Sequence, residues 1–571
     1  MNIVEKGTTE ASADLASEAP RLGGVPRTIQ PAEGAHNYQL LIKQLLLSGV
    51  RYQPKQEIVY SDKIRYSYST LLERIRRLAN VLTQCGVRPG DTVGLLDWDS
   101  HRALECFFAV PMLGAVLHTV NVRLSAEQIC FTMNHATDRL VLVHDDFIPL
   151  MKQLRKDLIS VKGFVRLTEV EAPDACEELN VIGDYESLLS GASDKFEFPD
   201  FDENSVATLF YTTGTTGAPK GVYFTHRQLV LHTLGEISAF SATGAQPVLR
   251  SGDVYMPITP MFHVHAWGVP YLATTLGIKQ VYPGRYEPRH LVNLLRKEGV
   301  TFSHCVPTIL QMILECVDGR SADMNGWKVL VGGSALTMGL ATKASDRGIQ
   351  VLTGYGMSET CPLVSMSYLD AKAMELPLEQ QLQLRISAGL PVPLVDLRVV
   401  DEEGNDVSHD GESLGEIVVR APWLTQGYVN EPAQGEALWA GGWLHTGDVA
   451  CIGSDGVVQI RDRIKDVIKS GGEWISSVEL EDLISQHSEV ESVAVVGIPD
   501  ERWGEQPLAW IVRVPNSHLD QSSLAVYLQQ YVVAGRLSKW AIPRQVRFVP
   551  SIPKTSVGKI NKRLIRETGP E

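Results

Sequence analysis

One segment restricts the fold of this chain more than any other: glycines, threonines and a lysine that directly follow an apolar stretch. It reads VATLFYTTGTTGAPKGVYFTH and covers residues 206–226. Glycines allow backbone N–H groups to approach a ligand closely, the threonines add hydroxyl groups, and Lys220 adds a positive charge. A surface turn needs only roughly two to five such residues and no lysine. The segment therefore predicts a loop that binds a polyphosphate.

The spacing of this loop differs from that of two common phosphate-binding motifs. The Walker pattern G-x-x-x-x-G-K-[ST] fails because Pro219 stands where the second glycine is required, and G-x-G-x-x-G is also missing from the segment. Val222–Thr225 is rich in residues that favour strands, and Thr225 with Gln228 has the spacing of a capping box. The loop is therefore predicted to join two strands, with a helix after the second.

Composition excludes several classes of protein. A chain of 571 residues allows three or four domains, and its 44% hydrophobic and 21% charged residues are typical of soluble globular proteins. No apolar run reaches 18 residues, so no membrane span is predicted. The eight cysteines include no C-x-x-C pair, which argues against zinc and redox sites and predicts a reducing cytoplasm. A net charge of −15 argues against nucleic acid as a partner.

The C-terminal segment has the opposite charge. Between residues 536 and 566 there is no Asp or Glu, which suits contacts to anionic phosphates. Its nine basic residues are Arg536, Lys539, Arg544, Arg547, Lys554, Lys559, Lys562, Arg563 and Arg566.

The order of predicted elements indicates layers of helices and strands. Residues 1–35 lack a hydrophobic segment and are predicted to be a mobile tail. The segment YSYSTLLERIRRLANVLTQCG has a helical apolar stripe, with Thr70 and Glu73 predicted as its capping box and Gly86 as its stop. PGDTVGLLDWDS then predicts a turn and a buried strand. This alternation continues to about Val331 and indicates an α/β fold.

The last hundred residues predict a smaller domain. Residues 448–460 predict a hairpin that turns at Asp455-Gly456. The short charged segment DRIKD is a candidate linker, with the domain boundary at about Arg463. Ser476 and Glu479 then predict a capped helix, and VESVAVVGI and PLAWIVRV predict two strands. These elements suffice for a small α+β domain.

Four motifs, in their order along the chain, resemble those of a known enzyme family. The loop matches [YF]-T-[ST]-G-T-[ST]-G-x-P-K-G, and GYGMSET (354–360), WLHTGD (443–448) and PKTSVGKINKR (553–563) follow it. From about residue 40 onward the chain resembles the AMP-forming acyl-CoA synthetases of the adenylate-forming (ANL) superfamily, and in particular the branch with medium-chain fatty acyl-CoA ligases and methylmercaptopropionate-CoA ligases.

The resemblance implies an α/β fold with a defined division. It implies a large N-terminal adenylation domain, 36–462, built of layered α/β subdomains plus a small β-barrel-like subdomain. A hinge at 463–466 and a small mobile α+β C-terminal domain, 467–571, would follow, with the tail 1–35 in front.

The resemblance also assigns roles to single residues. Tyr355 would stack on adenine, and Asp448 would accept hydrogen bonds from the ribose hydroxyls with Arg463 beside it. Glu359 would bind Mg²⁺ together with Thr212, and the catalytic set would be Lys559, Glu359, Thr212 and Lys220. The implied nucleotide-binding residues are Thr212, Thr213, Gly214, Thr215, Thr216, Gly217, Lys220, Val264, Gly333, Ser334, Thr353, Gly354, Tyr355, Gly356, Ser358, Asp448, Arg463, Lys465, Lys469, Trp474 and Lys559.

Two further segments are implied to bind the other substrates. PMFHVHAWG resembles the wall of the acyl channel, with Trp267 as its gate. Its two histidines suggest a metal or a base, but we interpret His263 as a wall group and His265 as a polar neighbour. The implied acyl-binding residues are His263, Trp267, Gly332 and Gly333, and the implied CoA-binding residues are Ser470, Gly471, Gly472, Glu473 and Trp474. Thr213 and Ser358 depart from the commoner residues of the motifs, yet both keep a hydroxyl.

The implied activity is that of an ATP-dependent acid–CoA ligase. ATP and a carboxylic acid, predicted to be a medium-chain or other fatty acid, would form acyl-AMP, and CoA would then form the thioester; Mg²⁺ is the implied metal cofactor. One alternative is a 3-methylmercaptopropionate-CoA ligase, and another is an adenylating enzyme that loads a separate carrier protein. A silent binding protein on the same fold is a third. A cytoplasmic location is predicted, and a homodimer is left open.

Overall fold

A computed structural model describes residues 28–170, 178–212, 218–242, 244–245, 247–316, 324–470, 473–555 and 558–569. The chain divides into two compact units, Met1–Tyr38 and Gln39–Glu571. The described part of the first unit contains one turn, in which Ala35 N donates to Ala32 O. Most of the predicted tail, residues 1–27, lies outside the described residues.

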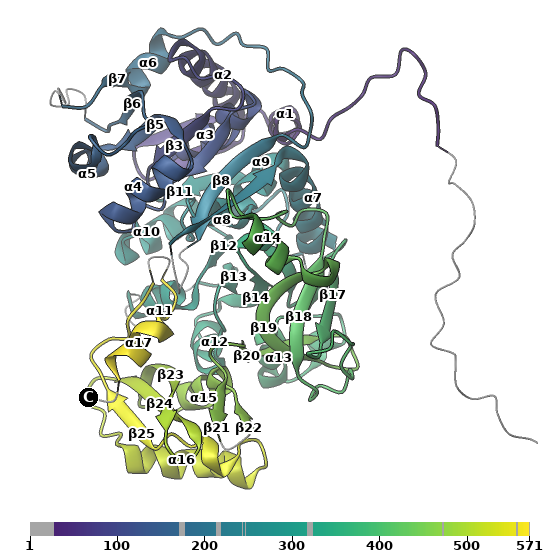
Figure 1. Ribbon diagram of the computed structural model, residues 1–571, viewed down its shortest axis with the longest axis vertical. Coiled ribbons are helices and arrows are strands. Elements are labelled where there is room, and N and C mark those ends of the chain that lie inside the picture. The colour runs from purple at the N-terminus through teal and green to yellow at the C-terminus, as the bar shows by residue number, and fades with distance from the viewer. Residues whose placement is uncertain are drawn as a thin grey trace, which may run out of the picture. The chain divides into compact units, whose positions relative to one another are not determined.

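A seven-stranded sheet forms the first part of the second unit (Figure 1). Its order is β7-β6-β5-β3-β4-β8-β9, and every pairing except that of β8 with β9 is parallel. The predicted strand after the PGD turn is confirmed as β3, and all five of its residues are buried. The strands are β3 (Thr92–Leu96), β4 (Val116–Thr119), β5 (Asp138–His144), β6 (Gly163–Leu167), β7 (Val181–Asp184), β8 (Val206–Thr212) and β9 (Lys220–Thr225).

A nine-stranded sheet forms the second layer, in the order β16-β15-β14-β13-β12-β10-β11-β1-β2. Its central pairings are parallel, and antiparallel strands stand at both edges. The strands are β1 (Glu57–Tyr60), β2 (Ile64–Ser67), β10 (Val254–Pro257), β11 (Lys279–Tyr282), β12 (Phe302–Cys305), β13 (Lys328–Gly332), β14 (Gln350–Gly356), β15 (Leu363–Met366) and β16 (Leu390–Pro391).

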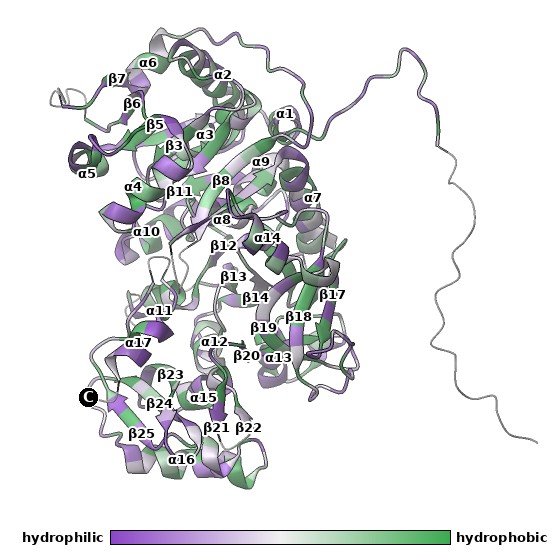
Figure 2. Cartoon of the chain, viewed as in Figure 1, coloured by the Kyte–Doolittle hydropathy of each residue, from purple (hydrophilic) through white to green (hydrophobic). Residues whose placement is uncertain are grey.

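Helix α3 (His101–Met112) joins these two sheets. All of its residues are buried, and it contacts β1 of the second sheet as well as β3, β4 and β8 of the first. A helix that is apolar over most of its circumference is stable only when other elements pack against all of its sides. The two sheets pack against α3 in this way. The other helices of this region are α1 (Ile42–Tyr52), α2 (Tyr68–Gln84), α4 (Ala126–His135), α5 (Ile148–Leu154), α6 (Tyr185–Gly191), α7 (His226–Ala242), α8 (Val264–Trp267), α9 (Val269–Thr275), α10 (Pro288–Glu298), α11 (Pro307–Cys316), α12 (Met338–Ser345), α13 (Leu378–Ile386) and α14 (Pro432–Leu438). Several of them, such as α7, alternate hydrophobic and hydrophilic colour along their length (Figure 2).

The predicted start of α2 is wrong by one turn. The helix begins after Ser67, whose side chain accepts from Thr70 N at 3.2 Å, so Thr70 and Glu73 do not form its capping box. The reason is that β2 pairs with β1 up to Ser67, and the chain turns into the helix directly afterwards. The predicted stop is confirmed, because Gly86 has φ of +86°. Among the described residues, no helix has both the length and the apolar character needed to cross a membrane.

A four-stranded antiparallel sheet, β17-β18-β19-β20, occupies the place of the expected barrel-like subdomain. Its strands are β17 (Asp396–Val400), β18 (Gly415–Arg420), β19 (Leu444–Ile452) and β20 (Val458–Arg463). The predicted hairpin is confirmed as β19 and β20, with Gly456 at φ of +80° in the connection.

The C-terminal elements form the predicted α+β arrangement. The strands β21 (Ile468–Ser470), β22 (Glu473–Ile475), β23 (Val490–Asp500), β24 (Gly504–Arg513) and β25 (Gln545–Phe548) share one sheet, and the helices are α15 (Ser477–Ser485), α16 (Gln521–Val533) and α17 (Lys562–Thr568). Ser476 caps α15 as predicted, since its Oγ accepts from Glu479 N at 3.0 Å. The α/β fold class is thus confirmed, with a large region of layered sheets and a smaller C-terminal one.

Candidate active site

A buried cavity lies where the nine-stranded sheet meets Lys559 of the C-terminal segment. Strands β13 and β14 supply its floor, and the segment around α8 supplies a wall. The lining residues are Glu236, His263, Val264, Trp267, Leu330, Gly332, Gly333, Gly354, Tyr355, Gly356, Met357, Ser358, Pro362, Leu363 and Lys559. The cavity therefore brings together predicted residues from the segments PMFHVHAWG, GYGMSET and PKTSVGKINKR, together with Gly332 and Gly333.

Lys559 is held against Gly333 at one end of this cavity. A Cβ on Gly333 would stand 2.9 Å from Lys559 Cε, and φ of +79° there also favours glycine. Nearby, Thr308 Oγ1 donates to Gly558 O at 2.7 Å, so the loop that carries Lys559 is bound to helix α11. Burial, and then the charge of Arg463, lower the pKa of Lys559 to about 8.

This pKa predicts the pH dependence of the first chemical step. The resemblance implies that Lys559 neutralises negative charge on a phosphate, for which it has to be protonated. Its charged fraction falls as pH rises through about 8. We expect kcat/KM for pyrophosphate release, which reports groups of the free enzyme, to fall about tenfold per pH unit above that value. Lys559→Arg should lack this fall because a guanidinium stays charged. A wild-type profile that is flat well above pH 8 would contradict the assignment.

Tyr355, Asp448 and Arg463 form a polar group beside the cavity. Tyr355 Oη donates to Asp448 Oδ2 at 2.9 Å, and Arg463 Nε lies 3.1 Å from Asp448 Oδ1. Burial raises the pKa of Asp448, and the Arg463 charge opposes that rise. Because β19 and β20 pair Asp448 directly with Arg463, the sheet itself positions a carboxylate that can accept two hydroxyl donors.

Glu359 and Lys220 both contact Tyr428. Glu359 is 7% exposed, and its Oε1 accepts from Tyr428 Oη at 2.7 Å. Lys220 Nζ lies 4.8 Å from the centre of the Tyr428 ring. Lys220 begins β9 and Thr212 ends β8, and these two strands pair as predicted. Of the loop between them, the predicted residues Thr213, Gly214, Thr215, Thr216 and Gly217 lie outside the described residues.

The segment Val264–Trp267 has an unusual backbone. All four of its residues have φ between 48° and 59°, a left-handed conformation that costs roughly 1–2 kcal/mol per residue for side chains other than glycine. This turn places the Trp267 ring against Gly332, where a Cβ would stand 3.1 Å from it. Strain of this kind persists only where the surrounding structure enforces it.

The two histidines of this segment have different surroundings. His263 lines the cavity, and burial together with the Lys559 charge lowers its pKa to about 3. His265 is buried among aromatic rings, including Phe107 and Phe210, and neither of its nitrogens has a hydrogen-bond partner in the described part of the chain. In the described part of the chain, neither histidine belongs to a cluster of three or more His, Cys, Asp or Glu residues that could hold a metal ion.

The described residues that were predicted to bind CoA do not line the cavity, and neither do Lys465, Lys469 and Trp474, which were predicted to contact the nucleotide or to act as the hinge. Trp474 is 47% exposed, and Lys469 Nζ lies 5.6 Å from its ring centre. Lys465 is in a turn after β20, and Ser470 ends β21. None of these four lines the cavity in the described structure. Gly471, Gly472 and the side chain of Glu473 lie outside the described residues.

Two more predicted residues flank the cavity on β14 and after β13. Thr353 N donates to Ser367 Oγ at 2.8 Å, while Thr353 Oγ1 is buried without a partner among the described residues. Ser334 follows the cavity-lining Gly333 and is exposed.

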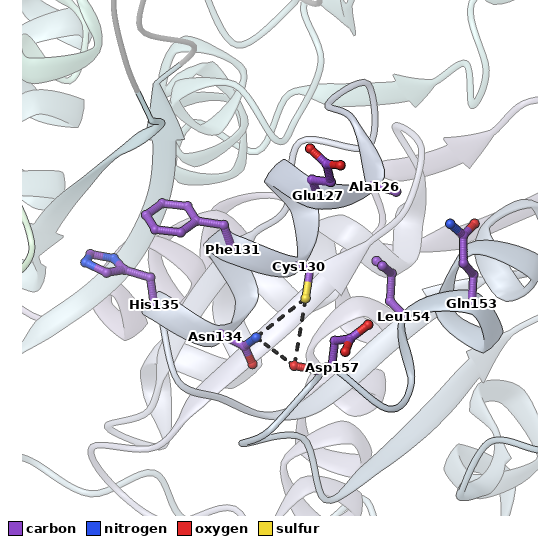
Figure 3. Close-up of a pocket in the computed structure, with 9 residues that line it drawn as sticks. All are labelled: Ala126, Glu127, Cys130, Phe131, Asn134, His135, Gln153, Leu154 and Asp157. Carbon is purple, nitrogen blue, oxygen red and sulfur yellow. Dashed lines mark hydrogen bonds between the residues drawn. The ribbon is translucent and has the colours of Figure 1, made fainter.

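A larger hollow at the surface contains none of the predicted site residues (Figure 3). Its lining residues are Ala126, Glu127, Cys130, Phe131, Asn134, His135, Gln153, Leu154 and Asp157. Its polar groups bind one another, since Asn134 Nδ2 donates to Asp157 O at 2.8 Å and to Cys130 Sγ at 3.5 Å. The buried cavity at Lys559, where perturbed groups converge, is therefore the candidate active site.

Sequence reasoning missed two functional candidates. Tyr428, which contacts both Glu359 and Lys220, lies in a segment without a recognised motif. Glu236 falls on the buried stripe of α7 with Leu229, Thr233 and Phe240, at helical spacing. A charged residue on an apolar stripe is the signal that could have found it.

Comparisons with known proteins identify the family of this chain. The family model described as AMP-binding enzyme matches residues 48–429, and that of the AMP-binding enzyme C-terminal domain matches residues 479–559. The long-chain-fatty-acid–CoA ligase of Thermus thermophilus is 39% identical over 553 residues, which cover 96% of this chain and 98% of that protein. The 3-methylmercaptopropionyl-CoA ligase of Ruegeria lacuscaerulensis is 37% identical, with coverage of 92% and 97%.

Solved structures show the same fold. The crystal structure of the anthranilate CoA ligase AuaEII in complex with anthranoyl-AMP matches with a TM-score of 0.81 and 22% identity, covering 92% of this chain and 97% of that one. The family model spans more than half of the chain, and the Thermus relative covers nearly all of it. The chain therefore belongs to the AMP-binding enzymes, the family in which its fatty-acid and methylmercaptopropionyl CoA ligase relatives are found.

Proposed function

We propose that this chain is an AMP-forming acid–CoA ligase that activates a carboxylic acid, predicted to be a medium-chain or other fatty acid, with ATP. The observation that carries the proposal is the convergence of three charged groups around one cavity. Lys559 lines the cavity, Asp448 accepts a hydrogen bond from the cavity-lining Tyr355, and the buried Glu359 follows the cavity-lining Ser358. The charges of Asp448 and Glu359 both act on Lys559. A protein that only bound nucleotide would have no need of Lys559.

The first half-reaction joins the acid to AMP. A carboxylate oxygen attacks the α-phosphorus of ATP, the bond to the β-phosphate oxygen breaks, and acyl-AMP and pyrophosphate form. Negative charge gathers at the α-phosphate during this step. Lys559 supplies a positive charge at the cavity, and such a charge stabilises the transition state strongly where water is excluded. Asp448 and Tyr355 orient the nucleoside, so no side chain is required as a nucleophile.

The second half-reaction transfers the acyl group to a thiol. CoA sulfur attacks the acyl carbonyl carbon, and AMP leaves. Lys559 lines the cavity that the thiol must approach, and Trp474 of the predicted CoA segment is 47% exposed. We therefore propose that the C-terminal domain rotates about a hinge at 463–466 between the two steps.

The cysteine pattern supports a reducing compartment such as the cytoplasm.

Glu359 fits a site for the Mg²⁺ that would accompany ATP. A carboxylate oxygen is a preferred ligand of Mg²⁺, which completes its shell with phosphate oxygens and water, and the hydroxyl of Thr212 would be a second ligand. Bound Mg²⁺ would offset phosphate charge. The Tyr428 hydroxyl fixes one Glu359 oxygen at 2.7 Å and leaves the other for the metal.

Glu359→Gln is expected to weaken the use of MgATP about tenfold to a hundredfold, because it removes the charge with little change in volume. Pyrophosphate release across a Mg²⁺ titration measures this as a higher Mg²⁺ requirement. Tyr428→Phe is the companion variant, since it removes the hydrogen bond and keeps the carboxylate. An unchanged Mg²⁺ dependence in Glu359→Gln would mean that Glu359 does not bind the metal.

The activity itself is tested by the products. Purified protein, ATP, Mg²⁺ and one acid at a time are assayed for pyrophosphate over a panel of straight-chain, aryl and thioether acids, and thioester and AMP are then identified by mass spectrometry. CoA and a phosphopantetheinyl carrier protein are offered separately. Acyl-CoA with AMP is the expected result. A protein that ignores CoA but loads the carrier would instead be a carrier-loading enzyme.

A further inference from the structure

Glu236 is a buried carboxyl group that the proposed reaction does not use. It lies on α7, is 2% exposed, and lines the cavity that ends at Lys559. Its Oε2 accepts no hydrogen bond from any described residue. Buried polar groups nearly always have partners, and those without one call for an explanation. A partner supplied by a bound ligand would be such an explanation.

Glu236 and Lys559 line the same cavity but have different neighbours. Lys559 stands against Gly333, and the Trp267 ring stands against the neighbouring Gly332. A Cβ on Gly268, the residue that follows Trp267, would lie 3.1 Å from Glu236 Oε2. An acid whose carboxylate reaches Lys559 would therefore direct the far end of its chain past Trp267 toward Glu236.

His232 adds a second polar group at this end. Its Nε2 accepts from Leu363 N at 3.3 Å, so the proton of the neutral ring is on Nδ1, which lies 3.7 Å from Glu236 Oε2. Burial lowers the pKa of His232 to about 3 and raises the pKa of Glu236 well above its usual value. Burial therefore favours the neutral form of both groups. A protonated carboxyl group can donate one hydrogen bond and accept others.

We propose that Glu236, with His232 beside it, forms a polar end to the acyl cavity, and that the preferred acid carries a hydroxyl group on the far part of its chain. A hydroxyl can accept from the carboxyl O–H and donate to its other oxygen, so it satisfies both. An unbroken alkyl chain would leave Glu236 unpaired. This inference rests on the proposed function and specifies the acid that the same site takes.

The expected selectivity between hydroxy acids and alkyl acids follows from the polar groups of the pocket. A site built to hydrogen-bond a substrate hydroxyl discriminates strongly against the analogue that lacks it, whereas an apolar pocket disfavours an added hydroxyl. Straight-chain acids of about three to eight carbons are compared with the ω-hydroxy acids of the same lengths. At the best length, we expect kcat/KM for the hydroxy acid to exceed that for the alkyl acid by about tenfold or more.

Two variants at Glu236 locate the source of this preference. Glu236→Leu should reverse the ratio, because an apolar side chain of similar size favours the alkyl acid. Glu236→Gln should keep a preference for the hydroxy acid, because an amide also donates and accepts. Glu379→Gln, at an exposed position on α13, is the matched control and should leave the ratio unchanged. Thermal unfolding of each variant checks that it is folded.

The outcomes separate this inference from the proposed function. If no acid supports pyrophosphate release and acyl-CoA formation, the proposed function fails. If alkyl acids are used as well as or better than their hydroxy partners by wild type, the inference alone is overturned, and this result needs no variant to fold. A wild-type preference that persists in Glu236→Leu would place its source at other residues and overturn the role of Glu236.

Discussion

Lys559→Ala is expected to lower the rate of acyl-AMP formation by about a thousandfold, while thioester formation from supplied acyl-AMP stays within a few-fold of wild type. The charge that it removes lies at the cavity beside Gly333, where the α-phosphate would gather negative charge in the first step alone. In the second step AMP leaves from an already formed mixed anhydride. The proposed rotation takes Lys559 away before that step, so its loss should matter little there.

Separate assays of the two half-reactions decide this prediction. Pyrophosphate release from ATP and acid measures the first, and acyl-CoA formation from synthetic acyl-AMP and CoA measures the second. Lys554→Ala is the matched control, because Lys554 is an exposed lysine of the same basic segment and does not line the cavity. Equal loss in both half-reactions of Lys559→Ala would show that the lysine supports the structure rather than the first step.

The sequence predicted those parts of the site in which the proposed chemistry requires particular residue types at a particular spacing. The strand pair around the phosphate loop follows from short-range pattern, and it is confirmed by the pairing of β8 with β9. The predicted start of α2 was wrong because the short-range pattern left two choices. Ser67 and Thr70 are both suitable caps, and the choice between them is made by the pairing of β2 with β1.

Other features depend on contacts that no local pattern contains. The left-handed turn at Val264–Trp267 contradicts the intrinsic preference of its residues, so it exists only because the surrounding packing enforces it. Glu236 is buried because β13 and β14, about a hundred residues further along the chain, complete its cavity. The helical stripe could identify Glu236 as unusual, but only the assembled fold shows that it faces the same cavity as Lys559.

The last prediction concerns the motion between the two steps. Residues 464–466 form a turn between β20 and β21, in which Asp466 N and Val467 N both donate to Arg463 O. Helix α15 is bound to the strand just before this turn, since Ser477 N and Ser477 Oγ both donate to Asp462 Oδ2 at 2.6 Å. A rotation of the C-terminal domain about the turn has to change backbone dihedral angles there while β20 stays in its sheet.

Lys465→Pro is expected to retain acyl-AMP formation within a few-fold and to lower acyl-CoA formation by about a hundredfold. Proline fixes φ near −65° and restricts the residue before it, so it opposes the dihedral change without touching the cavity. Hinge residues of this kind alter turnover although they lie away from the reacting bonds. Lys465→Ala is the control, because it removes the same side chain and leaves the backbone free.

Single-turnover measurements of acyl-AMP and acyl-CoA by mass spectrometry distinguish the possibilities, with free CoA and with a phosphopantetheinyl carrier as acceptors. Accumulation of acyl-AMP in Lys465→Pro, but not in Lys465→Ala, is the expected result, because the first step needs only the arrangement that already places Lys559 in the cavity. If Lys465→Pro forms acyl-CoA at the wild-type rate, the chain rotates at another residue. If both variants lose the second step equally, the lysine side chain rather than the backbone supports it.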